Sequence, residues 1–115
     1  MAANAFATAF TKAHMLAAQT GDGGGAGKFD QARHLAIEIV SDNAEANAAG
    51  LLGLTRVTTI RSVPERRARI RLFRSVLLKL REASGGCPDF VAAVPENPTP
   101  DDLFHMILDL DRSGH

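Results

Sequence analysis

The fold of this chain is decided by residues 62–83, which read SVPERRARIRLFRSVLLKLREA. Ser62 is a good helix cap, Pro64 suits a first turn and Glu65 completes a capping box, so a helix is predicted from about Val63 to Ala83. At about 100° per residue, one side of this helix gathers the apolar residues Leu72, Phe73, Val76, Leu77 and Leu80. The opposite arc carries the basic residues Arg67, Arg71, Arg74, Lys79 and Arg81. The segment therefore predicts a long amphipathic helix with an apolar and a basic face.

Two helices and a loop are expected at the start of the chain. The first helix spans Ala3–Gln19 and spaces its apolar residues at roughly helical intervals: Phe6, Phe10, Ala13, Met15 and Ala17. The second helix spans Lys28–Val40 and has a face made of Phe29, Ala32, Leu35, Ala36, Ile39 and Val40. Between them, the glycine-rich residues 21–27 predict a flexible loop, because each glycine in a helix or strand carries a large entropy cost.

A third helix is expected to open at Asp42. Its neighbours Ser41 and Asn43 offer capping side chains, and Asp42 with Glu45 has the form of a capping box. The core side of this helix is predicted at Ala46, Leu51, Leu54, Val57 and Ile60. A break near Thr58–Thr59 is the alternative end of this helix.

After residue 83, the chain is expected to hold an irregular connection and one more helix. Glycine and proline are frequent in residues 84–99, which leaves room only for a short turn around Asp89–Ala93. Thr99 as a cap and Pro100 in the first turn then predict a helix to about Asp111, with a core face at Leu103, Phe104, Ile107, Leu108 and Leu110. The chain is therefore expected to be an all-α single domain over residues 1–115, a compact bundle or stack of about five antiparallel helices.

The composition is that of a globular protein of a reducing compartment. Apolar residues make up 45% of the chain and charged residues 23%, far from the signature of disorder. The single cysteine, Cys87, excludes an intramolecular disulfide. Lys12 follows the short apolar run at the N-terminus, the wrong order for a secretory signal, and no apolar run reaches the ~20 residues of a membrane span. We expect a cytoplasmic protein that does not contact membranes; the sequence does not indicate its oligomeric state.

Two features that suggest chemistry do not complete a known site. Gly27 and Lys28 resemble the end of a phosphate-binding P-loop, but Asp22 stands where the first glycine is needed and Phe29 where a hydroxyl is needed. Cys87 lies just beyond the basic helix, whose C-terminus disfavours a thiolate, and its local sequence contains no evident base. We therefore predict no catalytic residue and no cofactor.

Two histidines stand between acidic residues at i, i+4 and i+8 on one helical face. The stripes are Asp30, His34 and Glu38, and Asp101, His105 and Asp109. One stripe could donate two metal ligands, but both lie opposite the apolar face of their helix, so we expect solvated polar surfaces and no metal site. An enzyme is the third hypothesis for this chain, and it requires the two histidine stripes to come together in the fold.

The uneven distribution of charge is the strongest functional signal. The net charge is zero, yet nine of the thirteen basic residues lie between Arg56 and Arg81, and acidic residues dominate from Glu82 onward. The basic helix face has a row that repeats every seven residues and two further cations beside it: Arg67, Arg74 and Arg81, then Arg71 and Lys79. Such asymmetry indicates a charged partner rather than a particular fold.

This face predicts a noncatalytic adaptor or regulatory module that binds another protein, through an acidic region recognised by Arg67, Arg71, Arg74, Lys79 and Arg81. Nucleic-acid binding by the same helix is the alternative, although the neutral total charge and an expected absence of exposed aromatics favour a protein partner. Two structural interpretations also stay open: a solvated helix face, or docking on the acidic C-terminal helix of the same chain at Asp101, Asp102, Asp109 or Asp111.

A family resemblance covers residues 27–54. The run Gly27–Ala32 resembles the turn that opens the second helix of a tetratricopeptide repeat, and Asp42–Ala46 resembles the link into the next helix. The chain departs from the repeat at Ala36, where a bulky aromatic is usual. The resemblance implies antiparallel helical hairpins and a peptide-binding adaptor role.

Overall fold

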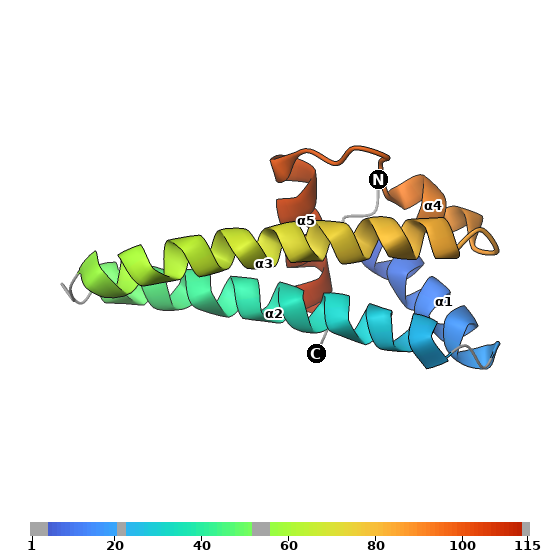
Figure 1. The fold of residues 1–115 in the computed structure, drawn as a ribbon, viewed down its shortest axis with the longest axis horizontal. Coiled ribbons are helices and arrows are strands. Elements are labelled where there is room, and N and C mark those ends of the chain that lie inside the picture. The colour runs from blue at the N-terminus through green and yellow to red at the C-terminus, as the bar shows by residue number, and fades with distance from the viewer. Residues whose placement is uncertain (1–4, 21–22, 52–55, 114–115) are drawn as a thin grey trace.

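Five helices make up the regular structure of the described residues (Figure 1). The computed structural model describes residues 5–20, 23–51 and 56–113, and it describes side chains in 5–20, 26–41 and 65–113. The helices are α1 (Ala5–Gln19), α2 (Gly23–Leu51), α3 (Arg56–Ala83), α4 (Pro88–Ala93) and α5 (Pro100–Ser113). These ranges contain no strand, so the predicted all-α fold is confirmed.

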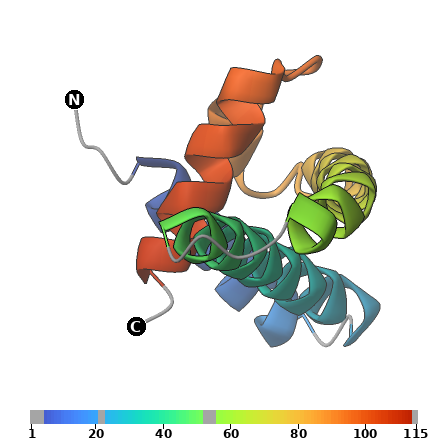
Figure 2. The same cartoon turned by 90° about the vertical axis from the view of Figure 1, so that its left-hand side faces the viewer.

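A long antiparallel hairpin of α2 and α3 organises the other helices (Figure 1). Both α1 and α5 pack against α2, while α4 packs against α1 and α3. In the view along the hairpin, α2 lies between α3 and α1 (Figure 2). The three shorter helices cover only part of the hairpin, so the end where α2 stops and α3 starts extends beyond them.

The glycine-rich stretch is helical rather than a loop. Because α2 begins at Gly23 and continues through Gly27, the predicted loop is wrong from residue 23 onward, and residues 21–22 lie outside the described ones. Each helical glycine costs about 0.5–1 kcal/mol relative to alanine. The adjoining Phe29 and Ala32 offset this cost, since they are 2% and 0% exposed. Packing therefore outweighs helix propensity at this end of α2.

The predicted boundary between a second and a third helix does not exist. Helix α2 continues through Ser41 and Asp42 to Leu51, so the expected helix start at Asp42 is wrong. A capping box is a local preference, whereas α2 packs along α3, and this pairing favours continued helix. The side chains of the expected core residues beyond this point, Ala46, Leu51, Leu54, Val57 and Ile60, lie outside the described ones.

Helix α3 begins before residues 62–65, the capping residues that predicted its start. It starts at Arg56, so the predicted start near Val63 and the alternative helix end near Thr58–Thr59 are both wrong. Pro64 lies inside α3, where a proline removes one backbone hydrogen bond. The long contact with α2 compensates for that loss.

The C-terminal elements follow the sequence closely. The expected short turn within residues 84–99 is α4, and α5 starts behind Thr99 as predicted. Thr99 Oγ1 accepts the backbone N–H of Asp102 at 3.1 Å, and the Thr99 N–H donates to Asp102 Oδ2 at 3.0 Å. These two bonds form a complete capping box, which defines the first turn of α5.

Phenylalanine rings from three helices meet at the centre of the core. Phe10 of α1, Phe29 of α2 and Phe90 of α4 are each at most 2% exposed. Their ring centroids are separated by 5.1 Å (Phe10–Phe29), 5.6 Å (Phe29–Phe90) and 6.1 Å (Phe10–Phe90), all in edge-to-face geometry. Helices α3 and α5 complete the core with Phe73, Val76, Leu77, Leu80, Leu103, Met106, Ile107 and Leu110.

Three residues that the periodicity placed on core faces are exposed. Met15, Leu72 and Phe104 keep 58%, 45% and 51% of their surface accessible, and Val40 and Leu108 are only partly buried. Leu72 and Phe104 lie at the margin of the apolar arc of their helices, one residue or about 100° from a fully covered neighbour. Met15 lies about 180° from Phe6, on the opposite side of α1 from its buried residues. The predicted burial of Met15, Leu72 and Phe104 is therefore wrong.

A polar contact joins α1 to α4 outside the core. Lys12 Nζ donates to Asp89 Oδ2 at 2.7 Å. This hydrogen bond, aided by the attraction between the charges, raises the pKa of the Lys12 ammonium above its ordinary value. The ammonium is therefore charged at neutral pH, and its contribution to this contact is lost as pH rises through that raised pKa.

Replacing Gly27 with alanine should stabilise the protein by up to about 1 kcal/mol, because Gly27 is helical and an added Cβ would meet no atom within 4 Å. Urea unfolding measures the change. The control is Gly85→Ala, which has equal space but lies in a turn and gains no helix propensity. Destabilisation by Gly27→Ala would contradict a helical residue 27.

Replacing Phe73 with alanine should lower the free energy of unfolding by about 3–5 kcal/mol, because a fully buried ring leaves a cavity. The neighbouring Leu72→Ala removes an exposed side chain and should cost less than about 1 kcal/mol. Equal losses for the two variants would show that the apolar face of α3 is misplaced.

Candidate functional site

Two arginines of the basic row of α3, Arg74 and Arg81, hold the connection between α4 and α5. Arg81 Nε donates to the Val94 carbonyl oxygen at 2.7 Å, and Arg81 Nη2 lies 3.9 Å from Glu96 Oε1. Seven residues earlier, Arg74 Nη2 donates to Asn97 Oδ1 at 3.0 Å. Because residues seven apart lie on the same side of a helix, the two arginines bind consecutive parts of residues 94–97. This contact places the connection along α3.

The acidic residues of α5 are not the partners of this row. Within the described part of the chain, no hydrogen bond or ion pair joins the five candidate residues Arg67, Arg71, Arg74, Lys79 and Arg81 to Asp101, Asp102, Asp109 or Asp111. Arg74 and Arg81 contact residues 94–97, the segment that leads into α5, rather than α5 itself.

The remaining basic residues of the face, Arg67, Arg71 and Lys79, are exposed. None of the three has a hydrogen bond or ion pair among the residues that the structure describes. Arg67 and Arg71 are one helical turn apart, so their guanidinium groups are neighbours along α3. The five predicted residues thus divide into two that hold the chain together and three that face solvent.

An apolar groove of about 520 Å³ lies between α2, α3 and α5. Its described lining is mostly apolar and includes Ile39, Val40, Ile70, Leu103, Phe104 and Leu108. Arg66 and Asp101 also line it, from α3 and α5 respectively. On α3, Ile70 lies one turn from Arg66 and is flanked in sequence by Arg71, so the groove and the exposed basic residues share a helix.

Sequence reasoning missed this groove because it placed Phe104 in the core. Phe104 is one residue, or about 100°, further around α5 than the buried Leu103. Leu108 stands one turn after Phe104 and is only partly buried. The sequence did contain a signal for the groove: the apolar arc of α5, from Leu103 to Leu108, is wider than one neighbouring helix covers.

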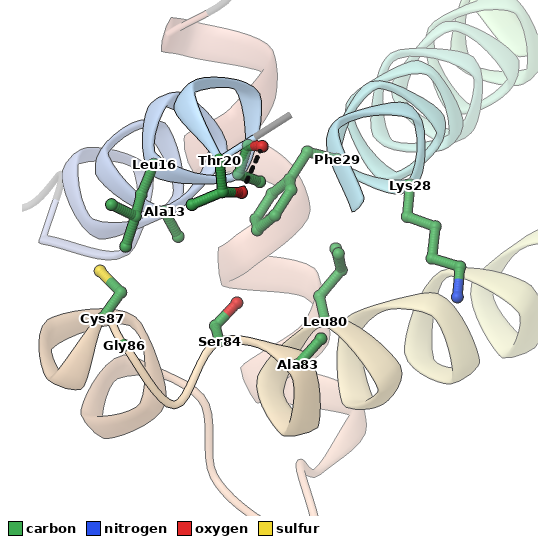
Figure 3. A pocket seen from close by; sticks show the side chains of 11 residues that line it. Ala13, Leu16, Thr20, Lys28, Phe29, Leu80, Ala83, Ser84, Gly86 and Cys87 are labelled. Atoms are coloured by element: carbon green, nitrogen blue, oxygen red, sulfur yellow. Dashed lines mark hydrogen bonds between the residues drawn. The ribbon is translucent and has the colours of Figure 1, made fainter. Parts of the chain in front are cut away.

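A second cavity of about 380 Å³ lies where α1 ends, α2 begins and the α3–α4 turn passes (Figure 3). Its apolar lining includes Leu16, Phe29 and Leu80, and the Cys87 thiol points toward Leu16. Cys87 is a free cysteine, 3% exposed. None of the described lining residues is a histidine or a carboxylate, so the cavity places no base beside the thiol.

The two histidine stripes do not form one cluster. His34 Nε2 lies 2.9 Å from Glu38 Oε1 on its own helix, whereas Asp30 Oδ1 lies 3.3 Å from His14 Nε2 of α1. The ring of His105 has Phe104 as its aromatic neighbour. In the described ranges, no group of three or more His, Cys, Asp or Glu residues is arranged to hold a metal ion.

No protein-family model, curated protein or solved structure matches this chain. The resemblance of residues 27–54 to tetratricopeptide repeats therefore stays a prediction. None of the helices in the described residues has the length and apolar character that crossing a membrane requires.

Arg81→Ala should lower the free energy of unfolding by about 1–3 kcal/mol, because it removes a charged donor from the Val94 carbonyl. Arg67→Ala, in the same row but exposed, should cost less than about 0.5 kcal/mol. Urea unfolding measures both, and faster amide exchange around residues 94–97 should accompany the first change only. If the two variants are equally stable, Arg81 does not hold the connection.

Proposed function

We propose that this protein is a noncatalytic cytoplasmic module that binds an acidic region of another protein through Arg67, Arg71 and Lys79 of α3. One observation carries the proposal: these three cations are exposed and have no partner among the described residues, while Arg74 and Arg81 are engaged within the chain. A reducing location is supported by Cys87, a buried free thiol.

The geometry suits carboxylates. Arg67 and Arg71 are adjacent on one helical face, and a guanidinium offers a planar fork of donors that matches a carboxylate. Both are carried by a helix that packs along α2, so their backbone is already ordered before a partner arrives. Charged side chains in such positions mainly steer a partner and fix its orientation.

Nucleic-acid binding is the alternative that the test must separate. Binding to a duplex commonly uses about 6–10 phosphate contacts, whereas the described part of α3 presents three unpartnered cations. The exposed Phe104 corrects the expectation that no aromatic is exposed, and it adds an apolar anchor of the kind that protein interfaces use.

The test reverses the charge of the two exposed arginines, Arg67 and Arg71. The variant Arg67→Glu with Arg71→Glu should keep the native fold by circular dichroism and lose capture of specific proteins from an extract of the native cells. Each captured protein is then purified, and its affinity for the variant should fall about tenfold or more. The control, Lys28→Glu with Arg112→Glu, makes the same change in net charge at exposed sites on α2 and α5.

Duplex and single-stranded DNA are titrated with the same variants over a salt series. Steep salt dependence together with loss of DNA binding in the Arg67 and Arg71 variant would favour the nucleic-acid alternative. Unchanged capture and unchanged affinity in that variant would leave these residues as a solvated helix face and contradict the proposal.

A further inference from the structure

The groove between α2, α3 and α5 contains an exposed aromatic in a protein that otherwise buries its aromatics. Phe6, Phe10, Phe29, Phe73 and Phe90 are all at most 7% exposed, while Phe104 is 51% exposed. Phe104 lines the groove together with Ile70 and Leu108. Exposed apolar residues that gather in one hollow, rather than singly, mark a binding surface.

Resting on the proposed function, we propose that this groove binds the apolar face of an amphipathic helix of the partner protein, and that acidic residues of the same helix pair with Arg67 and Arg71. The groove and the basic residues would then recognise one ligand. The apolar contacts provide most of the affinity, and the charges select and orient the partner.

The walls of the groove favour a helical ligand. All three walls are helices, which use their backbone N–H and C=O groups internally, so they offer no strand edge to an extended peptide. A helical ligand satisfies its own backbone hydrogen bonds when it enters such an apolar groove. Phe104 with Leu108 forms an i, i+4 ridge on α5 against which the ligand helix can pack.

Charge complementarity specifies where the acidic residues of the ligand lie. The α3 wall carries Arg66 and Ile70. The exposed Arg67 and Arg71 follow these two residues directly in sequence, about 100° further around α3, and so border this wall. The α5 wall carries Asp101, which repels a carboxylate. Acidic side chains of the bound helix therefore face α3, and its side toward Asp101 is neutral or basic.

The test begins with a displayed library of helical peptides. Leucine is fixed at i, i+3, i+4 and i+7, all other positions are random, and the full-length protein is the immobilised target. The expected result is enrichment of aspartate and glutamate on one flank of the leucine stripe. Failure to enrich any sequence, or enrichment of basic flanks, overturns the proposal.

An enriched peptide is then synthesised and titrated calorimetrically against variants. Phe104→Ala should weaken binding about tenfold or more, since it removes a central aromatic anchor. The matched control Leu72→Ala removes an exposed apolar side chain from the outer side of α3 and should change affinity less than about twofold. Hydrogen exchange on the unmodified protein gives a second readout, with protection expected around residues 66–71 and in α5.

The variants separate this inference from the proposed function. If Arg67→Glu with Arg71→Glu abolishes capture of the partner protein while Phe104→Ala leaves it unchanged, the groove is overturned and the proposed function stands. If Phe104→Ala abolishes peptide binding and the charge reversal has no effect, the acidic ligand and the proposed function both fail. Sedimentation equilibrium tests a second copy as the occupant: a dimer that Phe104→Ala converts to monomer overturns the proposal.

Discussion

The edge-to-face contact of Phe10, Phe29 and Phe90 is the interaction on which the rest of the structure depends. It joins the consecutive helices α1 and α2 to α4, which lies beyond α3 in the chain. Because Phe29 lies in the first part of α2, its burial fixes that end of the hairpin and makes a helix of the glycines before it. Because Phe90 is the centre of the short α4, the same contact fixes where the connection to α5 begins.

Helix ends that depend on local side chains could be predicted from the sequence. Helix ends and burial that depend on packing against another helix could not. Thr99 and Pro100 set the start of α5 through a local capping box, so the sequence locates it correctly. Gly23 and Asp42 carry equally plain local signals for loop and helix start, yet both are overruled by packing at a distance. In the same way, periodicity identifies Phe73 as buried but misplaces Leu72, because the width of a buried arc depends on the neighbour that covers it.

The candidate site shows the same division. Spacing alone identified the basic face of α3, including the seven-residue row. Its separation into Arg74 and Arg81, which bind the chain, and Arg67 and Arg71, which face solvent, depends on the path of residues 94–97. That path is irregular and leaves no periodic signal in the sequence. The two arginines that bind this segment also lead the chain toward Thr99, so they help to position the α5 wall of the groove.

The packing of α5 against α2 also has a consequence for how the protein is made. Helix α5 is synthesised after the other four helices, and it contributes Leu103, Met106, Ile107 and Leu110 to the core. Until it leaves the ribosome, the apolar side of α2 that it covers stays open to water, because two helices, α3 and α4, separate it from α2 along the chain. A chain on which translation stalls before residue 103 therefore lacks this part of its core and stays exposed to chaperones and proteases.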